Sequence, residues 1–182
     1  MMNELAKFCS LVLFVATFST LSNANVLPEV VAKEHAGLSV RGEGVLRFFG
    51  IKVYEARLWA SAKSLAKSIA PAEPFALELV YDMAVKGRDI AERSTAEMRK
   101  IGYSDEAKLK AWGEEMLRIF PDIKKGESLI GVSIPGKGAK FYSREKLIAS
   151  ADDPEFTKAF FDIWLSEKTS EPKLRVRLLG LQ

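Results

Sequence analysis

The segment RFFGIKVYEARLW, residues 47–59, combines β-branched and aromatic side chains with charges at Arg47, Glu55 and Arg57. A strand with one face in water alternates apolar and polar residues. Here both alternating sets of positions mix apolar with charged side chains, so neither set forms a purely polar face. The sequence therefore predicts a strand that is covered on both sides, or one that lines a site requiring a charge.

The remaining patterns predict strands first, then helices, then a hairpin and further helices. Strand-like runs separated by glycines lie at 38–41, 45–49, 51–60 and 75–83, and a second group flanks a Pro-Gly turn at 129–134 and 140–143. Helical periodicity is found at 88–101, 104–120, 153–165 and from residue 170 onward. This order predicts an α+β fold, in which helices pack against an antiparallel sheet.

The helix expected at 153–165 has the clearest signals. Asp153 is suited to cap it, Pro154 occupies the first helical position, and one face is apolar, comprising Phe156, Ala159, Phe160, Ile163 and Trp164. We interpret this helix as part of the core. The last helix is expected to point Leu174, Leu178 and Leu181 inward.

The first 24 residues have the features of a secretory signal peptide. Lys7 precedes a largely apolar run, 8–21, and the small residues Ser22 and Ala24 follow it. The run is shorter than the roughly 20 residues that span a bilayer. We expect residues 1–24 to be cleaved, leaving 25–182 as a single periplasmic domain that is not stably inserted in the membrane. An uncleaved anchor is the alternative.

Composition and motifs exclude several classes of function. The net charge is only +3, and basic residues are interspersed with acids, so no nucleic-acid partner is expected. His35 is the only histidine, and Cys9, the only cysteine, lies in the expected signal peptide. No metal-ligand cluster or hydrolase motif is present, so we expect no metal and no cofactor. No catalytic residue and no oligomeric state are predicted.

Five motifs together resemble the chalcone isomerase-like family. The strand from Gly50 to Trp59 matches its pattern G-x-x-V-Y-x-A-x-L-[W/Y]. The others, in order, are FALELVY at 75–81, PGxGxxF at 135–141, FFDIWL at 160–165 and SxxxLRxxLLG at 170–180. The set extends over about residues 38–180 and is most similar to the bacterial exported members of the family.

The resemblance implies a curved antiparallel sheet with helices against it and a cleft between the two. Plant members of the family close a chalcone ring to a flavanone, and an arginine orients the attacking phenolate. Other members bind fatty acids, with an arginine and a tyrosine at the carboxylate. Both uses require a buried cation beside an apolar slot.

By this resemblance, Arg47 is the expected buried cation and Tyr54 is its partner in a ligand site, with Arg41 as the alternative cation. Arg47 occupies an odd-numbered position and Tyr54 an even-numbered one, and such positions alternate between the two faces of a strand. The two side chains therefore share a face only if Gly50 forms a bulge or bend. The competing interpretation pairs Arg47 with a neighbouring acid and makes Tyr54 a core residue. Glu55 and Arg57, two apart on one face, predict a cross-strand ion pair.

One departure from the plant enzymes argues against chalcone cyclisation. Where they carry a catalytic threonine, this chain has Phe49 or Gly50, and neither side chain can donate a hydrogen bond to a ketone. The leading hypothesis is therefore non-enzymatic binding of a small apolar or amphipathic anion such as a fatty acid. The alternatives are an isomerase or lyase acting on an enone, and a non-catalytic structural or interaction module of the cell envelope.

Overall fold

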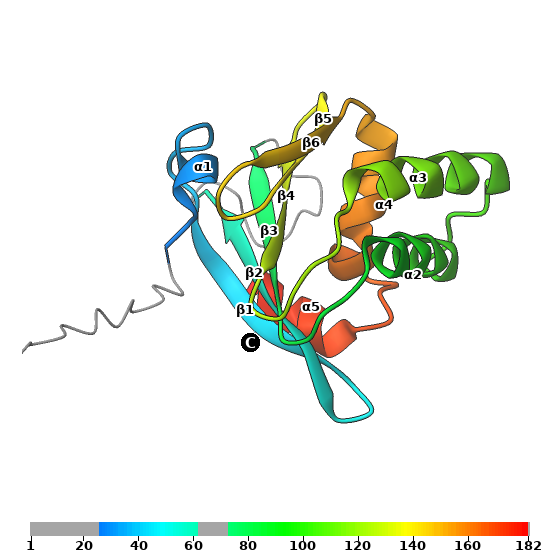
Figure 1. The fold of residues 1–182 in the computed structure, drawn as a ribbon, viewed down its shortest axis with the longest axis horizontal. Helices are drawn as coiled ribbons and strands as arrows, with labels where there is room; N and C mark the ends of the chain where they lie inside the picture. Colours follow the sequence, from blue (N-terminus) through cyan, green and yellow to red (C-terminus); the bar gives the residue numbers. More distant parts are fainter. Residues whose placement is uncertain (1–25, 62–72, 182) are drawn as a thin grey trace, which may run out of the picture.

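The structure, a computed structural model, describes residues 26–61 and 73–181, and its centre is a six-stranded antiparallel sheet (Figure 1). Each strand pairs with the next one in the chain, in the order β1-β2-β3-β4-β5-β6. The strands are β1 (Ser39–Phe48), β2 (Ile51–Ala60), β3 (Phe75–Tyr81), β4 (Ser128–Ile134), β5 (Gly138–Tyr142) and β6 (Leu147–Ala151). The helices are α1 (Glu29–Ala32), α2 (Gly87–Lys100), α3 (Glu106–Ile119), α4 (Pro154–Leu165) and α5 (Pro172–Leu179).

The predicted α+β fold class is confirmed, since helices pack on an open antiparallel sheet (Figure 1). The expected signal peptide, residues 1–24, lies outside the described residues. Within residues 26–61 and 73–181, no helix is long and apolar enough to cross a membrane.

Both faces of strand β2 are covered, which is the first of the two alternatives that its sequence left open. The even positions Tyr54, Ala56 and Leu58 belong to the main core, which also contains side chains of α2 and α4. On the opposite face, Trp59 packs in a smaller cluster with Val31 of α1. The two alternating sets of β2 therefore enter two separate apolar clusters, which explains why neither set is purely polar.

The predicted cross-strand ion pair is confirmed and is part of a larger network on the α1 face of the sheet. Arg57 is only 5% exposed, and its Nη2 lies 2.6 Å from Glu55 Oε1. Its Nε lies 3.3 Å from Glu43 Oε2 on β1, and its Nη1 lies 3.8 Å from Glu78 Oε2 on β3. Glu78 is fully buried and also pairs with Arg144, whose Nη2 is 2.7 Å from Oε1.

Strand β1 is one continuous strand, whereas the sequence predicts two short strands separated at Gly42 and Gly44. Gly42 does not break the strand but allows helix α5 to approach it. A Cβ atom at Gly42 would lie 2.0 Å from the carbonyl oxygen of Arg177 and 2.6 Å from that of Leu178. The glycine is therefore required by close packing rather than by a turn.

Local helix signals agree well with the structure. Asp105 and Asp153 cap α3 and α4, each accepting hydrogen bonds from two backbone N–H groups. Leu181, expected to point inward, is exposed, because Gly180 adopts a left-handed conformation (φ 61°) and ends α5. The short elements α1 and β6 are absent from the sequence prediction.

Candidate functional site

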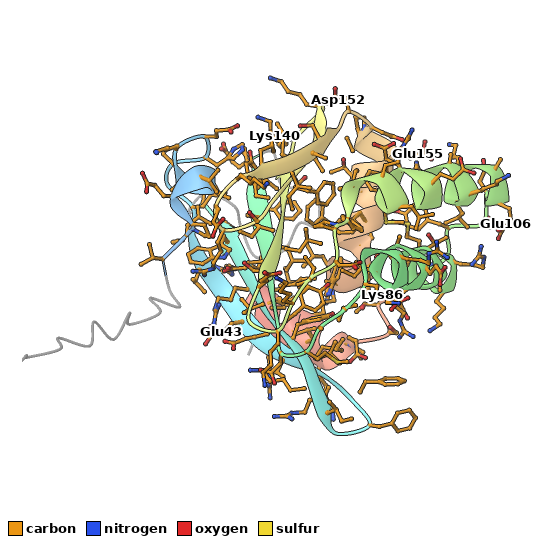
Figure 2. The ribbon with its side chains drawn as sticks, in the orientation of Figure 1. Glu43, Lys86, Glu106, Lys140, Asp152 and Glu155 are labelled. Carbon is orange, nitrogen blue, oxygen red and sulfur yellow. The ribbon has the colours of Figure 1, made fainter. Side chains whose placement is uncertain are left out.

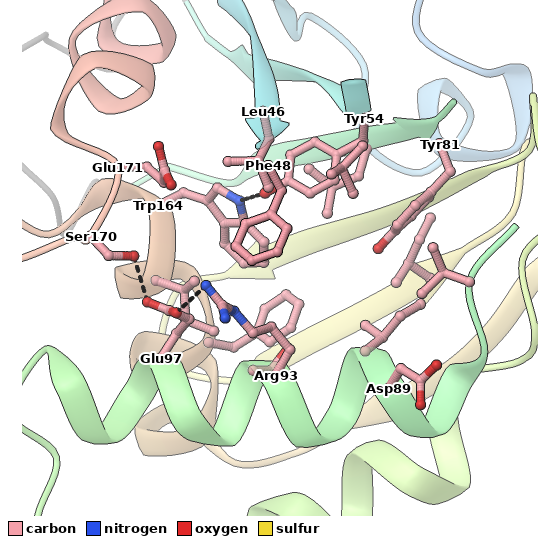
Figure 3. A pocket seen from close by; sticks show the side chains of 18 residues that line it. Leu46, Phe48, Tyr54, Tyr81, Asp89, Arg93, Glu97, Trp164, Ser170 and Glu171 are labelled. Carbon is pink, nitrogen blue, oxygen red and sulfur yellow. Dashed lines mark hydrogen bonds and ion pairs between the residues drawn. The ribbon is translucent and has the colours of Figure 1, made fainter. Parts of the chain in front are cut away.

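A pocket of about 270 Å³ lies between strands β1–β4 and helices α2 and α4, close to the start of α5 (Figure 3). Small-molecule pockets are clefts of roughly 300–1,000 Å³ with mostly apolar walls and a few polar groups. The apolar walls here include Leu46, Val53, Leu79, Leu129, Phe160 and Ile163. The pocket is therefore slightly smaller than this range, but its lining is that of a small-molecule site.

A one-residue bulge in β2 shapes the sheet side of the pocket. Leu46 pairs with Tyr54, but the next residue of β1, Arg47, pairs with Lys52, so Val53 is the extra residue. Such a bulge bends the strand and redirects its side chains. Val53 and Tyr54, although consecutive, both line the pocket as a result.

Tyr54 is a buried hydrogen-bonding group in the pocket wall. Its hydroxyl oxygen accepts a hydrogen bond of 2.9 Å from the indole Nε1–H of Trp164 (Figure 3). Burial raises the pKa of Tyr54 well above its usual value, so the phenol stays protonated. In the part of the chain that the structure describes, no acceptor takes its proton. The Tyr54 O–H is therefore available to donate to a ligand.

Tyr81 on β3 supplies a second phenol. Its ring packs edge-on against that of Tyr54, with 5.6 Å between centroids, and its hydroxyl is directed into the pocket toward α2 (Figure 3). Burial raises the pKa of Tyr81 as well. No hydrogen-bond partner of this hydroxyl lies among residues 26–61 and 73–181. A buried phenol without a partner loses free energy unless water or a ligand satisfies it.

Helix α2 contributes a charged edge to the pocket. Arg93 and Glu97 are one turn apart on its pocket side, and Arg93 Nη2 lies 2.7 Å from Glu97 Oε1 (Figure 3). Glu97 also pairs with Lys100 at 2.9 Å and accepts a 2.5 Å hydrogen bond from Ser170 Oγ. Burial acts to raise the pKa of Glu97, but these hydrogen bonds and the Arg93 charge keep it below its usual value. Glu97 is therefore a carboxylate with three donors.

The predicted site residues are not all at the pocket. Tyr54 lines it, but Arg47 is exposed on the β1–β2 hairpin, where its Nη1 donates to the Gly50 carbonyl oxygen at 3.1 Å. The expectation of a buried Arg47 is wrong, because the bulge lies at Val53 rather than Gly50 and leaves Arg47 on the face opposite Tyr54. Whether Arg47 contacts a ligand stays a prediction.

The alternative cation, Arg41, is also exposed, and its Nε donates to the Leu179 carbonyl oxygen at 3.2 Å, at the end of α5. The arginine that is buried is Arg57, on the other face of the sheet, where acids of the chain compensate its charge. Among the described residues, the cation that lines the pocket is Arg93. Arg93 and Glu97 have the i, i+4 spacing of an ordinary ion pair on a helix surface. The sequence therefore contains no signal that distinguishes Arg93 from a surface arginine.

Helix α4 has two roles, whereas its sequence predicts core alone. Phe156 and Ala159 are buried in the core, and Phe160, Ile163 and Trp164 also line the pocket. The described residues contain no group of three or more His, Cys, Asp or Glu side chains that could hold a metal ion. Two neutral phenols, one guanidinium and apolar walls can instead bind an apolar molecule through one oxygen-bearing end.

Comparisons with known proteins agree with the family and the fold that the sequence motifs predict. Residues 20–180 match the family model described as chalcone isomerase-like, the family that the ordered motifs predict. The crystal structure of the Arabidopsis thaliana fatty-acid binding protein is similar in fold, with a TM-score of 0.61 and 13% identity, over 80% of this chain and 88% of that chain. A Haemophilus influenzae protein described as uncharacterized is 27% identical over 107 residues, or 59% of this chain. That match spans 52% of the relative, about half of its length.

Proposed function

Given that the chain belongs to the chalcone isomerase-like family, we propose that its pocket binds a small amphipathic carboxylate, such as a fatty acid, without catalysis. The observation that carries the proposal is the pair of buried phenols, Tyr54 and Tyr81, which face an apolar pocket with donors that no described residue accepts. The similar fold of a plant fatty-acid binding protein supports the same class of ligand.

In the proposed complex the hydrocarbon chain lies against Leu46, Leu79 and Phe160, and the carboxylate faces the two tyrosines. Hydrogen bonds to a charged group contribute more than those between neutral groups. Arg93 can turn toward the carboxylate without leaving Glu97 unpaired, because Lys100 and Ser170 still donate to Glu97. The guanidinium is therefore available as the counter-charge.

Tyr81→Phe is expected to weaken laurate binding by roughly tenfold to a hundredfold, the value of one hydrogen bond to a charged group. The stability of the free protein should stay equal or rise, because the lost hydroxyl has no partner in the described chain. Calorimetric titration with laurate and urea unfolding measure the two quantities. Tyr103→Phe is the matched control: its hydroxyl donates to Asp162 at 2.7 Å outside the pocket, so it should lower stability and leave binding unchanged.

A second arm tests the cation. Arg93→Gln should weaken laurate binding, whereas Arg88→Gln, on the same helix but not in the pocket lining, should not. Equal laurate affinity in wild type, Tyr81→Phe and Arg93→Gln would contradict the proposal. Native mass spectrometry of the purified protein should also detect a retained fatty acid.

The isomerase alternative has less support. The position that matches the plant threonine falls at Phe49 or Gly50, and both lie in an exposed turn outside the pocket lining. Turnover of an enone without any retained ligand would favour the isomerase. If the protein shows no turnover and retains no ligand, a structural or interaction module of the envelope would be favoured.

We also propose that the protein acts in the periplasm, on the basis of the signal-peptide features of residues 1–24. Protein recovered from a periplasmic extract is expected to begin at Asn25, which N-terminal sequencing or intact mass determines. A chain that retains Met1 in the membrane fraction would instead identify an uncleaved anchor.

A further inference from the structure

The end of the β1–β2 hairpin, residues 47–52 with the sequence RFFGIK, is hereafter the hairpin tip. It extends beyond the rest of the molecule, with aromatic rings at its end (Figure 2). Phe49 is 91% exposed, Ile51 65% and Phe48 57%. Single exposed apolar residues are common, but three adjacent ones on a protrusion form a patch that indicates an interaction site.

The backbone at Phe49 makes this patch more unusual. Phe49 and Gly50 form the two-residue turn, with φ values of 47° and 81°. Such a turn has positive φ at both positions and favours Asn-Gly or Asp-Gly. Among the residues that the structure describes, Phe49 is the only non-glycine residue with positive φ. It therefore violates both the preference of the turn and the preference of a phenyl ring for burial, a combination expected at functional sites.

The hairpin tip is amphipathic as well as apolar. Arg47 and Lys52 pair across the strands on one face, and Phe48 and Ile51 pair on the other. Residues 47–52 contain no acid, although Glu55 and Asp82 each lie 3.6 Å from Lys52. The hydrogen bond from Arg47 Nη1 to the Gly50 carbonyl oxygen holds the guanidinium at the turn. Basic side chains beside exposed aromatic rings fit a surface of lipid headgroups over hydrocarbon.

We propose that the hairpin tip docks the protein on a lipid bilayer that contains anionic lipids. Phe49 and Ile51 enter the boundary between headgroups and acyl chains, and Arg47 and Lys52 contact the phosphates. Phe48 belongs to the hairpin tip and also lines the pocket, so docking brings the pocket beside the bilayer. Transfer of a ligand between bilayer and pocket rests on the proposed function, whereas docking itself does not.

The shape of the hairpin tip favours a bilayer over a protein partner. Stable protein interfaces bury about 800 Å² on each partner and need a complementary surface. A narrow two-residue turn with three apolar side chains offers little area for such an interface. Insertion into a bilayer requires no complementary surface, because the acyl chains rearrange around the rings.

The test is co-sedimentation with vesicles of phosphatidylcholine and phosphatidylglycerol in equal amounts. Wild type should bind, and Phe49→Asn should bind at least tenfold more weakly. Because asparagine suits the turn, this variant should be as thermally stable as wild type or more so. Leu117→Asn, which removes an exposed apolar residue of α3, is the matched control and should bind like wild type. Arg47→Gln and Lys52→Gln should each reduce binding about fivefold.

Three outcomes would overturn the docking proposal. In the first, the wild-type protein does not sediment with the vesicles. In the second, Phe49→Asn binds the vesicles as well as wild type does. In the third, the wild-type protein does not bind vesicles but forms a dimer, and Phe49→Asn disrupts that dimer. The last would assign the hairpin tip to a contact between two copies. Laurate titration separates the two proposals. Laurate binding without vesicle binding contradicts only the docking proposal, and vesicle binding without laurate binding contradicts only the fatty-acid site.

Discussion

Glu78→Ala is expected to lower the free energy of unfolding by about 3–5 kcal/mol, the cost of breaking a buried ion pair. Glu78 has no exposed surface and accepts from Arg144 Nε at 3.0 Å and Nη2 at 2.7 Å. Arg57, itself buried, faces its second oxygen at 3.8 Å. Removal of the carboxylate leaves positive charge in a site with little access to water and also creates a cavity. Urea unfolding of both proteins measures the change.

The matched control is Glu155→Ala. Glu155, near the start of α4, pairs with Lys108 at 2.6 Å, a contact as short as those of Glu78 (Figure 2). In contrast to Glu78, both partners of this ion pair are exposed. Exposed ion pairs contribute about 0–1 kcal/mol, so this variant should remain close to wild type. A loss below about 1 kcal/mol for Glu78→Ala would show that Arg57 is satisfied by its other acids and that the network adds little.

Phe141→Ala should lower the free energy of unfolding by about 3–5 kcal/mol through lost burial and a cavity. The ring has no exposed surface and packs against Phe120, Phe156 and Phe160, with centroids 5.3, 6.4 and 5.2 Å away. Phe141 does not line the pocket, so the folded variant should bind laurate like wild type. Denaturant unfolding and laurate titration at a temperature where the variant is folded measure both quantities.

Phe141→Leu keeps most of the volume and should cost less than about 1.5 kcal/mol. A variant Phe141→Ala with wild-type stability would mean that neighbouring rings collapse into the space. A variant that is folded but no longer binds laurate would show that the aromatic core supports the shape of the pocket.

Elements whose signals lie within one segment were predictable from the sequence. Asp105 and Asp153 cap their helices where expected, because a cap acts on backbone groups only two or three residues away. The family motifs likewise predicted the α+β fold and singled out Tyr54, which lines the pocket. Tyr81, whose hydroxyl has no partner among the described residues, and the cation Arg93 were not predicted, since their roles depend on neighbours distant in the chain.

The sequence by itself indicated that β2 is either covered on both sides or lines a charged site, that Arg57 joins a cross-strand ion pair, and that helices pack against the sheet. Only the tertiary structure decided which arginine is buried and which one borders the pocket. The physical reason is the period of a strand: one extra residue, Val53, puts Tyr54 on the face opposite Arg47, and Arg47 stays in solvent. Burial of Arg57 in turn depends on Glu78, a partner on another strand, and no local pattern specifies that pairing.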